Sequence, residues 1–202
     1  MSGAAEHPLV AAPLESRLWS LPEGVRLVEA NGVSPGVTYP RGFVASGVSA
    51  GIKESGRPDV GLLAAASDCR AQVTSAAVFT SNAFAAAPII VSQRETKLSK
   101  LCAVVANSGS ANACTGGEGL VVARGMQAAC AAELGIAPEQ VGVASTGLIG
   151  TVPPWDRVEQ GIAAAATSLQ ATGGADFLAS IMTTDRFPKA CALEVETADG
   201  VI

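Results

Sequence analysis

The spacing of apolar positions changes several times along the chain, and each change marks a predicted element. Short apolar runs bounded by turn-forming residues are typical of buried strands. On this pattern the first half of the chain predicts strands at residues 60–66, 72–79, 88–91 and 101–106. Turn-prone residues 67–70 separate the first two strands, and the last strand leads into a polar, glycine-containing loop at residues 107–112.

A second spacing, with apolar or alanine positions three and four residues apart, predicts helices in the second half of the chain. The predicted helices cover residues 120–134, 153–169 and 175–181. Gly135 follows the first helix at the C-cap position, and two prolines suit the first turn of the second. Gly173 and Gly174 separate the second helix from the third, and a short strand is expected at residues 140–145.

The last residues of the sequence predict a strand and a turn. Residues 190–197 alternate between polar and apolar side chains, which is typical of a half-exposed strand. The strand runs into Asp199-Gly200, a dipeptide that strongly favours a hairpin turn, yet almost no returning strand follows it. We therefore expect the sequence to be incomplete, and an in-frame stop codon directly after Ile202 would contradict this expectation.

The residues at the start of the chain differ from the rest in composition and in hydrophobic pattern. Proline punctuates residues 1–35, and only residues 18–27 show a short amphipathic pattern. We interpret residues 1–35 as an N-terminal extension of unknown role. The strand and helix patterns of residues 36–202 predict one domain of the α/β class, built from mixed sheets with flanking helices.

Composition supports a globular, cytoplasmic protein. Hydrophobic residues make up 49% of the chain but aromatic residues only 4%, so the core must consist of Ala, Val, Leu and Ile. The net charge of −5 is scattered, and the absence of a basic stripe argues against nucleic-acid binding. The apolar runs are too short to span a membrane, and the N-terminus lacks the basic and apolar segments of a secretory signal.

Cysteine and histidine usage restricts the possible chemistry. The five cysteines are widely spaced without a C-x-x-C pair, which predicts reduced, mostly buried thiols and no metal site. The single histidine, His7, lies in the N-terminal tail. Because no imidazole can be held beside a nucleophile, a Ser-His-Asp mechanism and a nucleophilic Cys114 are both disfavoured. Any catalysis must proceed without histidine.

Three loops follow apolar elements, where scaffolds commonly present reactive groups. They cover residues 107–116, 145–150 and 183–189. Thr146 and Gly147 have the hydroxyl and backbone N–H of an oxyanion hole, but the same pattern is more typical of an ordinary strand-ending turn. Thr183 and Asp185 suit either a ligand loop or a helix cap. Local pattern by itself favours the turn and the cap.

Two other features have a structural interpretation. Residues 47–53 look like a phosphate-binding loop but lack its G-K-[ST] ending and spacing, so nucleotide binding is not supported. We interpret Lys53 as a surface or interface lysine. Trp155 is interpreted as a packing anchor at a helix start rather than a substrate wall.

Several segments, taken together and in order, resemble one family. The matching segments are G-V-T at residues 36–38, G-V-S-A-G-I-K at 47–53, N-S-G-S-A-N-A-C-T-G at 107–116, S-T-G-L-I-G at 145–150 and I-M-T-T-D at 181–185 with P-K at 188–189. This series is similar to the α-chain part of the ornithine acetyltransferases, the bifunctional glutamate N-acetyltransferases of arginine biosynthesis. The resemblance covers the chain from about residue 36 to its end.

The resemblance implies an α/β fold related to self-processing N-terminal-nucleophile enzymes. A precursor of this family cuts itself at an Ala-Thr bond, and its α and β chains assemble as an α2β2 heterotetramer. The terminal threonine of the β chain, activated by its own α-amine, takes acetyl from N-acetylornithine and passes it to glutamate. No cofactor is implied, although acetyl-CoA is left open as a further donor.

The resemblance also assigns roles to residues of this chain. Thr146 and Gly147 would form the oxyanion hole, and Thr183 would bind substrate. The substrate-binding lysine and the Ala-Thr bond that follow in the family are not in this sequence, so the chain alone is expected to be inactive. Two alternatives stay open: a self-processing aminopeptidase-like amidohydrolase, and a non-catalytic assembly module.

Overall fold

The computed structural model describes residues 20–28 and 35–202. Its strands are β1 Val25–Leu27, β2 Phe43–Val48, β3 Val60–Ala65, β4 Ala103–Ser110, β5 Val141–Leu148, β6 Leu193–Thr197 and β7 Gly200–Val201. Its α-helices are α1 Ala87–Glu95, α2 Gly116–Leu134, α3 Trp155–Thr167 and α4 Gly174–Ile181, and short 3-10 turns lie at Gly36–Thr38, Arg70–Gln72 and Pro138–Gln140. No helix of the described ranges is long and apolar enough to cross a membrane.

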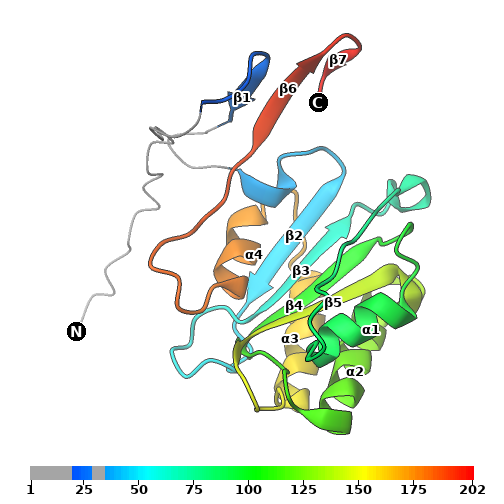
Figure 1. Ribbon diagram of the computed structural model, residues 1–202, viewed down its shortest axis with the longest axis vertical. Coiled ribbons are helices and arrows are strands. Elements are labelled where there is room, and N and C mark those ends of the chain that lie inside the picture. Colours follow the sequence, from blue (N-terminus) through cyan, green and yellow to red (C-terminus); the bar gives the residue numbers. More distant parts are fainter. Residues whose placement is uncertain (1–19, 29–34) are drawn as a thin grey trace.

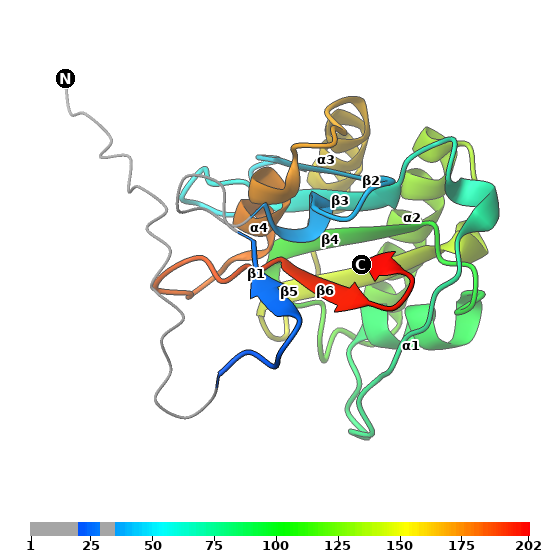
Figure 2. The ribbon, with the colours of Figure 1, turned by 90° about the horizontal axis from the view of Figure 1, so that it is seen from above.

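The centre of the molecule is a four-stranded mixed sheet in the order β2-β3-β4-β5 (Figures 1 and 2). Strands β2, β3 and β4 are antiparallel neighbours, whereas β4 and β5 run parallel. Parallel neighbours need a crossover connection, and helix α2 supplies it. As a result, the C-terminal ends of β4 and β5 meet at one edge of the sheet.

Helices cover both faces of this sheet. Successive side chains of a strand point to opposite faces, and both faces carry apolar side chains that need to be buried. Val60, Leu62, Val105 and Val143 point to one face and pack in the main core with residues of α1, α2 and α3. On the other face a smaller cluster joins strand residues to Phe177 of α4. Alanine is frequent in both clusters, as the low aromatic content predicted.

A second, small sheet lies apart from the first and has the order β1-β6-β7 (Figure 1). Strand β1 pairs antiparallel with β6, so the described part of residues 18–27 contributes a short strand. Strands β6 and β7 form the predicted hairpin, with Thr197 paired to Gly200 across the turn. Residues 1–19 and 29–34, including His7, lie outside the described residues.

Most predicted elements are confirmed, and some extend further than the pattern indicated. The strands at 60–66, 101–106 and 140–145 and all three helices are present. Gly135 closes α2 with a left-handed φ of 64°, which is the expected C-cap conformation. Strands β4 and β5 continue through the segments that were expected to be a loop and a strand-ending turn.

Two predicted strands are wrong. Residues 88–91 belong to helix α1, which begins with a proline in its first turn. A four-residue apolar run has no readable period, so only the longer element distinguishes helix from strand. Residues 73–79 form an irregular segment in which Val78 is 97% exposed. No neighbouring strand forms a ladder with this segment, so its β-forming residues do not make a strand.

The prediction that the thiols are mostly buried is wrong. All five thiols are free, but only Cys102 and Cys130 are buried, whereas Cys114 and Cys191 are exposed. Among the described residues no group of three His, Cys, Asp or Glu side chains is arranged to hold a metal ion. Spacing along the chain indicated the absence of disulfides but not which thiols reach the surface.

Candidate active site

The edge where β4 and β5 end carries an irregularity that requires glycine. Ser110 pairs with both Thr146 and Leu148, so the register shifts at this point as in a β-bulge. Gly147 has a φ of 131°, and a Cβ placed there would lie 2.4 Å from the carbonyl carbon of Gly109. Only glycine fits this close approach, which puts Thr146 and Gly147 beside β4 at the sheet edge.

Polar side chains next to this bulge fix its backbone by hydrogen bonds. Asn107 is fully buried; its amide nitrogen donates to the carbonyl of Ser110 at 3.0 Å. The hydroxyl of Ser145 donates to the side-chain oxygen of Asn107 at 2.6 Å. The hydroxyl of Ser110 donates in turn to the carbonyl of Thr151 at 2.6 Å. Satisfied buried networks of this kind fix one backbone arrangement.

A cavity of about 980 Å³ opens at this edge of the sheet. Its wall includes Ile52, Lys53, Arg57, Gly109, Thr146, Gly147, Met182, Thr183 and Pro188. The structure thus brings the three residues predicted for the site, Thr146, Gly147 and Thr183, to one cavity. The first two come from β5 and the third from the segment after α4, so no local pattern placed them together.

The β2–β3 loop forms another part of the wall, and an internal carboxylate organises it. The fully buried side chain of Asp59 accepts hydrogen bonds from the backbone N–H groups of Ala50, Ile52 and Lys53, at 2.7, 2.6 and 2.9 Å. The loop at residues 47–53 therefore does cradle an anion. The N–H groups that a phosphate-binding loop would direct toward a ligand are therefore used by the protein's own carboxylate.

Lys53 faces the cavity and is tied to two separate segments. Its ammonium donates to the carbonyl of Pro58 at 2.7 Å and to the carbonyl of Met182 at 2.6 Å. Burial lowers the pKa of this lysine below its ordinary value, and the carboxylate of Asp59 partly opposes the shift. From the sequence, Lys53 was interpreted as a surface or interface lysine. The only feature of the sequence that pointed to a place at the site was its position in the family-like segment 47–53.

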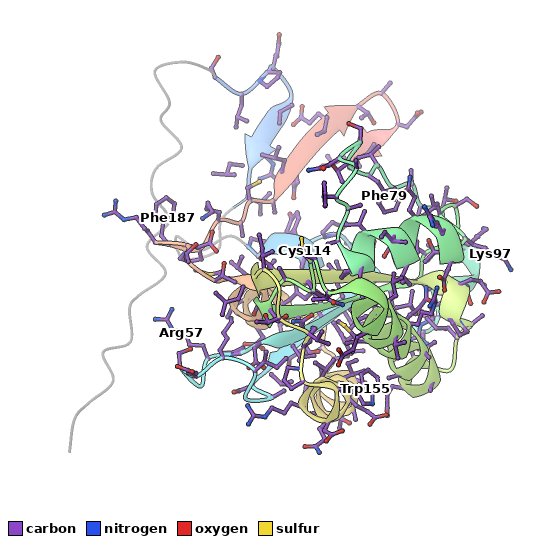
Figure 3. The ribbon with its side chains drawn as sticks, turned by 60° about the horizontal axis from the view of Figure 1, so that its bottom comes forward. Arg57, Phe79, Lys97, Cys114, Trp155 and Phe187 are labelled. Carbon is purple, nitrogen blue, oxygen red and sulfur yellow. The ribbon has the colours of Figure 1, made fainter. Side chains whose placement is uncertain are left out.

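The segment that follows α4 is an ordered turn and not a helix cap. The backbone N–H of Thr183 donates to the carboxylate of Asp185 at 3.1 Å, and Lys189 forms an ion pair with the same carboxylate. These two hydrogen bonds, that of Lys189 first, lower the pKa of Asp185. The ammonium of Lys189 also lies 5.3 Å from the ring centre of Phe187, which Figure 3 shows on the same side of the molecule as Arg57.

Trp155 is the packing anchor that the sequence indicated. It stands at the start of α3 next to α2 (Figure 3), and a side chain at Gly125 of α2 would meet its ring at 2.7 Å. Trp155 does not line the cavity. The rim beside Gly147 instead carries two exposed apolar side chains, Leu148 and Ile149, which are 69% and 71% exposed.

The fold matches two crystal structures. An ornithine acetyltransferase from Mycobacterium tuberculosis, crystallised with ornithine, matches with a TM-score of 0.77 and 36% identity, over 88% of this chain and 92% of that chain. The arginine biosynthesis bifunctional protein ArgJ of Bacillus halodurans matches with a TM-score of 0.72 and 31% identity, over 89% and 91%. The fold is therefore a mixed α/β fold of the ornithine acetyltransferase type, which confirms the predicted class.

Sequence relatives identify the family. The chain is 49% identical over 169 residues to the arginine biosynthesis bifunctional protein ArgJ of Symbiobacterium thermophilum, and 43% identical over 164 residues to that of Streptomyces coelicolor. The alignments cover 83% and 81% of this chain but 41% of each relative. The ArgJ family model matches residues 44–202, and the chain belongs to the ArgJ family.

Proposed function

We propose that this chain is the α-chain part of an enzyme that transfers acetyl from N-acetylornithine to glutamate in arginine biosynthesis. One observation carries the proposal: the adjacent Thr146 and Gly147 and the distant Thr183 line one cavity in a member of the ArgJ family. A hydroxyl and a backbone N–H at a glycine-dependent bulge are suited to stabilise a developing oxyanion. Thr183 lies in the same wall, where it serves the bound substrate.

In the proposed reaction, the hydroxyl of a β-chain N-terminal threonine attacks the acetyl carbonyl of N-acetylornithine. The threonine's own α-amine accepts the hydroxyl proton, and the negative oxygen of the tetrahedral intermediate is held by Thr146 and Gly147. The intermediate collapses to an acetyl-threonine ester, while the departing amine of ornithine takes up the proton. The amine of glutamate then attacks the ester carbonyl, the bond between the acetyl group and the threonine oxygen breaks, and the proton lost by the amine returns to the threonine hydroxyl as N-acetylglutamate leaves.

The lengths of the relatives support a two-chain protein. This chain covers 92% and 91% of the matched chains in the two crystals but only 41% of the curated sequences quoted above. Polypeptides of about this length are therefore separate chains in those crystals. Such a division agrees with self-cleavage of a precursor, with both pieces assembling as α2β2. The exposed Leu148 and Ile149 beside the cavity offer apolar surface for the second chain.

Expression of the full coding sequence tests the proposal. Mass spectrometry should find two polypeptides, the second beginning with threonine, and N-acetylornithine should add one acetyl group to that threonine. Added glutamate should remove the acetyl group as N-acetylglutamate, whereas loss of acetyl to water alone would indicate the amidohydrolase. A single uncut polypeptide that never becomes acetylated would contradict the proposal and favour an assembly module. Native mass spectrometry of the same preparation measures the α2β2 state, and labelled acetyl-CoA tests the further donor.

A further inference from the structure

Lys53 connects parts of the cavity wall that lie far apart in the sequence. Its backbone N–H is bound by Asp59, and its side chain lies against β4, because a Cβ at Gly109 would meet the side chains of Ile52 and Lys53 at 3.0 and 3.4 Å. Its ammonium then reaches the carbonyl of Met182, the residue directly before Thr183. One side chain thus links the β2–β3 loop, the bulge of β4 and the end of α4.

The link to Met182 acts where helix α4 has ended. Met182 is the C-cap of α4 and has an extended backbone, so its carbonyl is outside the helical hydrogen-bond pattern. The ammonium of Lys53 satisfies this carbonyl at 2.6 Å and that of Pro58 at 2.7 Å. A hydrogen bond from a charged donor is stronger than one between neutral groups, so it restrains the Met182–Thr183 peptide at the wall.

We propose that Lys53 is a positioning residue, whose ammonium holds the Met182 carbonyl so that Thr183 stays in the cavity wall that it shares with Thr146 and Gly147. This inference rests on the proposed function, since Thr183 is the residue through which Lys53 acts on substrate. The partial burial that lowers the pKa of Lys53 agrees with a structural hydrogen-bonding role at the cavity rather than with a freely solvated charge.

The test replaces Lys53 in the full-length protein. Lys53→Met keeps the aliphatic stem against Gly109 but removes the hydrogen bonds to Pro58 and Met182. We expect the KM for N-acetylornithine to rise about tenfold with a smaller change in kcat, because only the charge-assisted bond to Met182 acts on Thr183. Lys53→Arg retains donors and charge and should recover part of the loss. Lys97→Met is the matched control, because Lys97 lies at the opposite edge of the molecule from Arg57 and pairs with Glu139 (Figure 3).

A double-mutant cycle distinguishes positioning from general damage. If Lys53 acts through Thr183, Lys53→Met should add almost nothing to the KM effect of Thr183→Ala. Fully additive effects, or an unchanged KM in Lys53→Met, would overturn the proposal. If Lys53→Met does not fold, Lys53→Gln, whose amide reaches at most one of the two carbonyls, takes its place in the same cycle.

Hydrogen exchange provides a measurement that does not depend on catalysis. The amides of residues 182–184 should exchange several-fold faster in Lys53→Met than in the unsubstituted protein, and at an unchanged rate in Lys97→Met. Unchanged exchange in Lys53→Met would overturn the positioning role even in an active enzyme. If the unsubstituted protein transfers no acetyl but the exchange difference is present, the proposed function fails and the positioning role of Lys53 stands.

Discussion

Thr146 and Gly147 are adjacent, yet the structure constrains them in different ways. Gly147 is required by its positive φ and by its close contact with the backbone of Gly109. Thr146 is partly buried in the same cavity wall, and its side chain carries a hydroxyl that a valine of similar shape would lack. Gly147 is therefore required for the backbone conformation, whereas Thr146 is required for its hydroxyl. Only the hydroxyl can be removed without a change in the bulge.

The first prediction concerns Thr146→Val in the full-length enzyme. Loss of one oxyanion donor typically lowers turnover about 100- to 1,000-fold, and we expect that loss with a modest change in ornithine affinity. Steady-state kinetics and ornithine binding measure the two effects separately. Thr146→Ser, which keeps the hydroxyl, should retain most of the activity. An unchanged kcat in Thr146→Val would remove the proposed role.

A second residue-scale prediction concerns Cys130. Burial raises the pKa of its thiol to about 12, so the thiolate that reacts with alkylating agents is scarce at neutral pH. The native protein should remain unlabelled at Cys130 at pH 8, and denaturant should expose it, as peptide mass spectrometry will record. The Cys130→Ser variant should lack the label at this position in denaturant, which assigns the labelled peptide to Cys130. Rapid labelling of the folded protein at this position would contradict the burial.

The same pKa shift has a consequence for stability. An unfolded thiol ionises near pH 8.5, whereas the folded thiol stays neutral to a much higher pH. The stabilising contribution of the neutral Cys130 is therefore complete below the unfolded pKa and is lost as the pH rises toward about 12. Comparison of unfolding curves of the natural protein and Cys130→Ser across this alkaline range measures the difference.

At the scale of elements, long helices and the terminal hairpin were predictable because their signals are local. Helix α2 has a sustained helical spacing and a C-capping glycine, and the β6–β7 turn contains Asp199-Gly200. Residues 88–91 and 72–79 were not predictable, since short apolar runs fit either element until tertiary contacts decide. The continuation of β5 through Thr146 depended on β4 lying alongside, which no local pattern shows.

The β2–β3 loop supplies a prediction at this scale. Asp59→Asn replaces an acceptor of three backbone hydrogen bonds with a side chain that has one acceptor oxygen and an NH₂ group facing N–H donors. We expect the free energy of unfolding to fall by about 1–3 kcal/mol. Denaturant titration measures it, with the exposed Asp156→Asn as a control that costs less than about 1 kcal/mol. Equal effects in the two variants would argue against the role of the loop carboxylate.

For the molecule as a whole, the cavity depends on parts of the chain that meet at one sheet edge. Its wall is formed by the ends of β4 and β5, the loop after β2, helix α4 and the segment after α4. The rim beside Gly147 is apolar and exposed at Leu148 and Ile149. Exposed apolar residues at the edge of a cavity mark an interaction surface more often than isolated ones do.

The whole-molecule prediction is that this rim contacts the second chain of the proposed enzyme. Ile149→Asp should lower the yield of the assembled two-chain protein in size-exclusion chromatography, because a carboxylate would have to be buried without a partner. Val121→Asp is a suitable control: Val121 is 66% exposed on α2 and does not line the cavity. Normal assembly of Ile149→Asp would show that the rim does not contact the second chain.

The order of residues along the chain was enough to predict the α/β class, the main helices, the terminal hairpin and, through the series of motifs, the family and the candidate residues Thr146, Gly147 and Thr183. These properties depend on local spacing or on motif identity, both of which can be read along the chain. Three further facts are visible only in the folded chain: the candidates share one cavity, the side chain of Asp59 binds the 47–53 loop, and Lys53 reaches Met182. Such contacts join residues brought together by strand pairing and helix packing, so they exist only once the chain has folded.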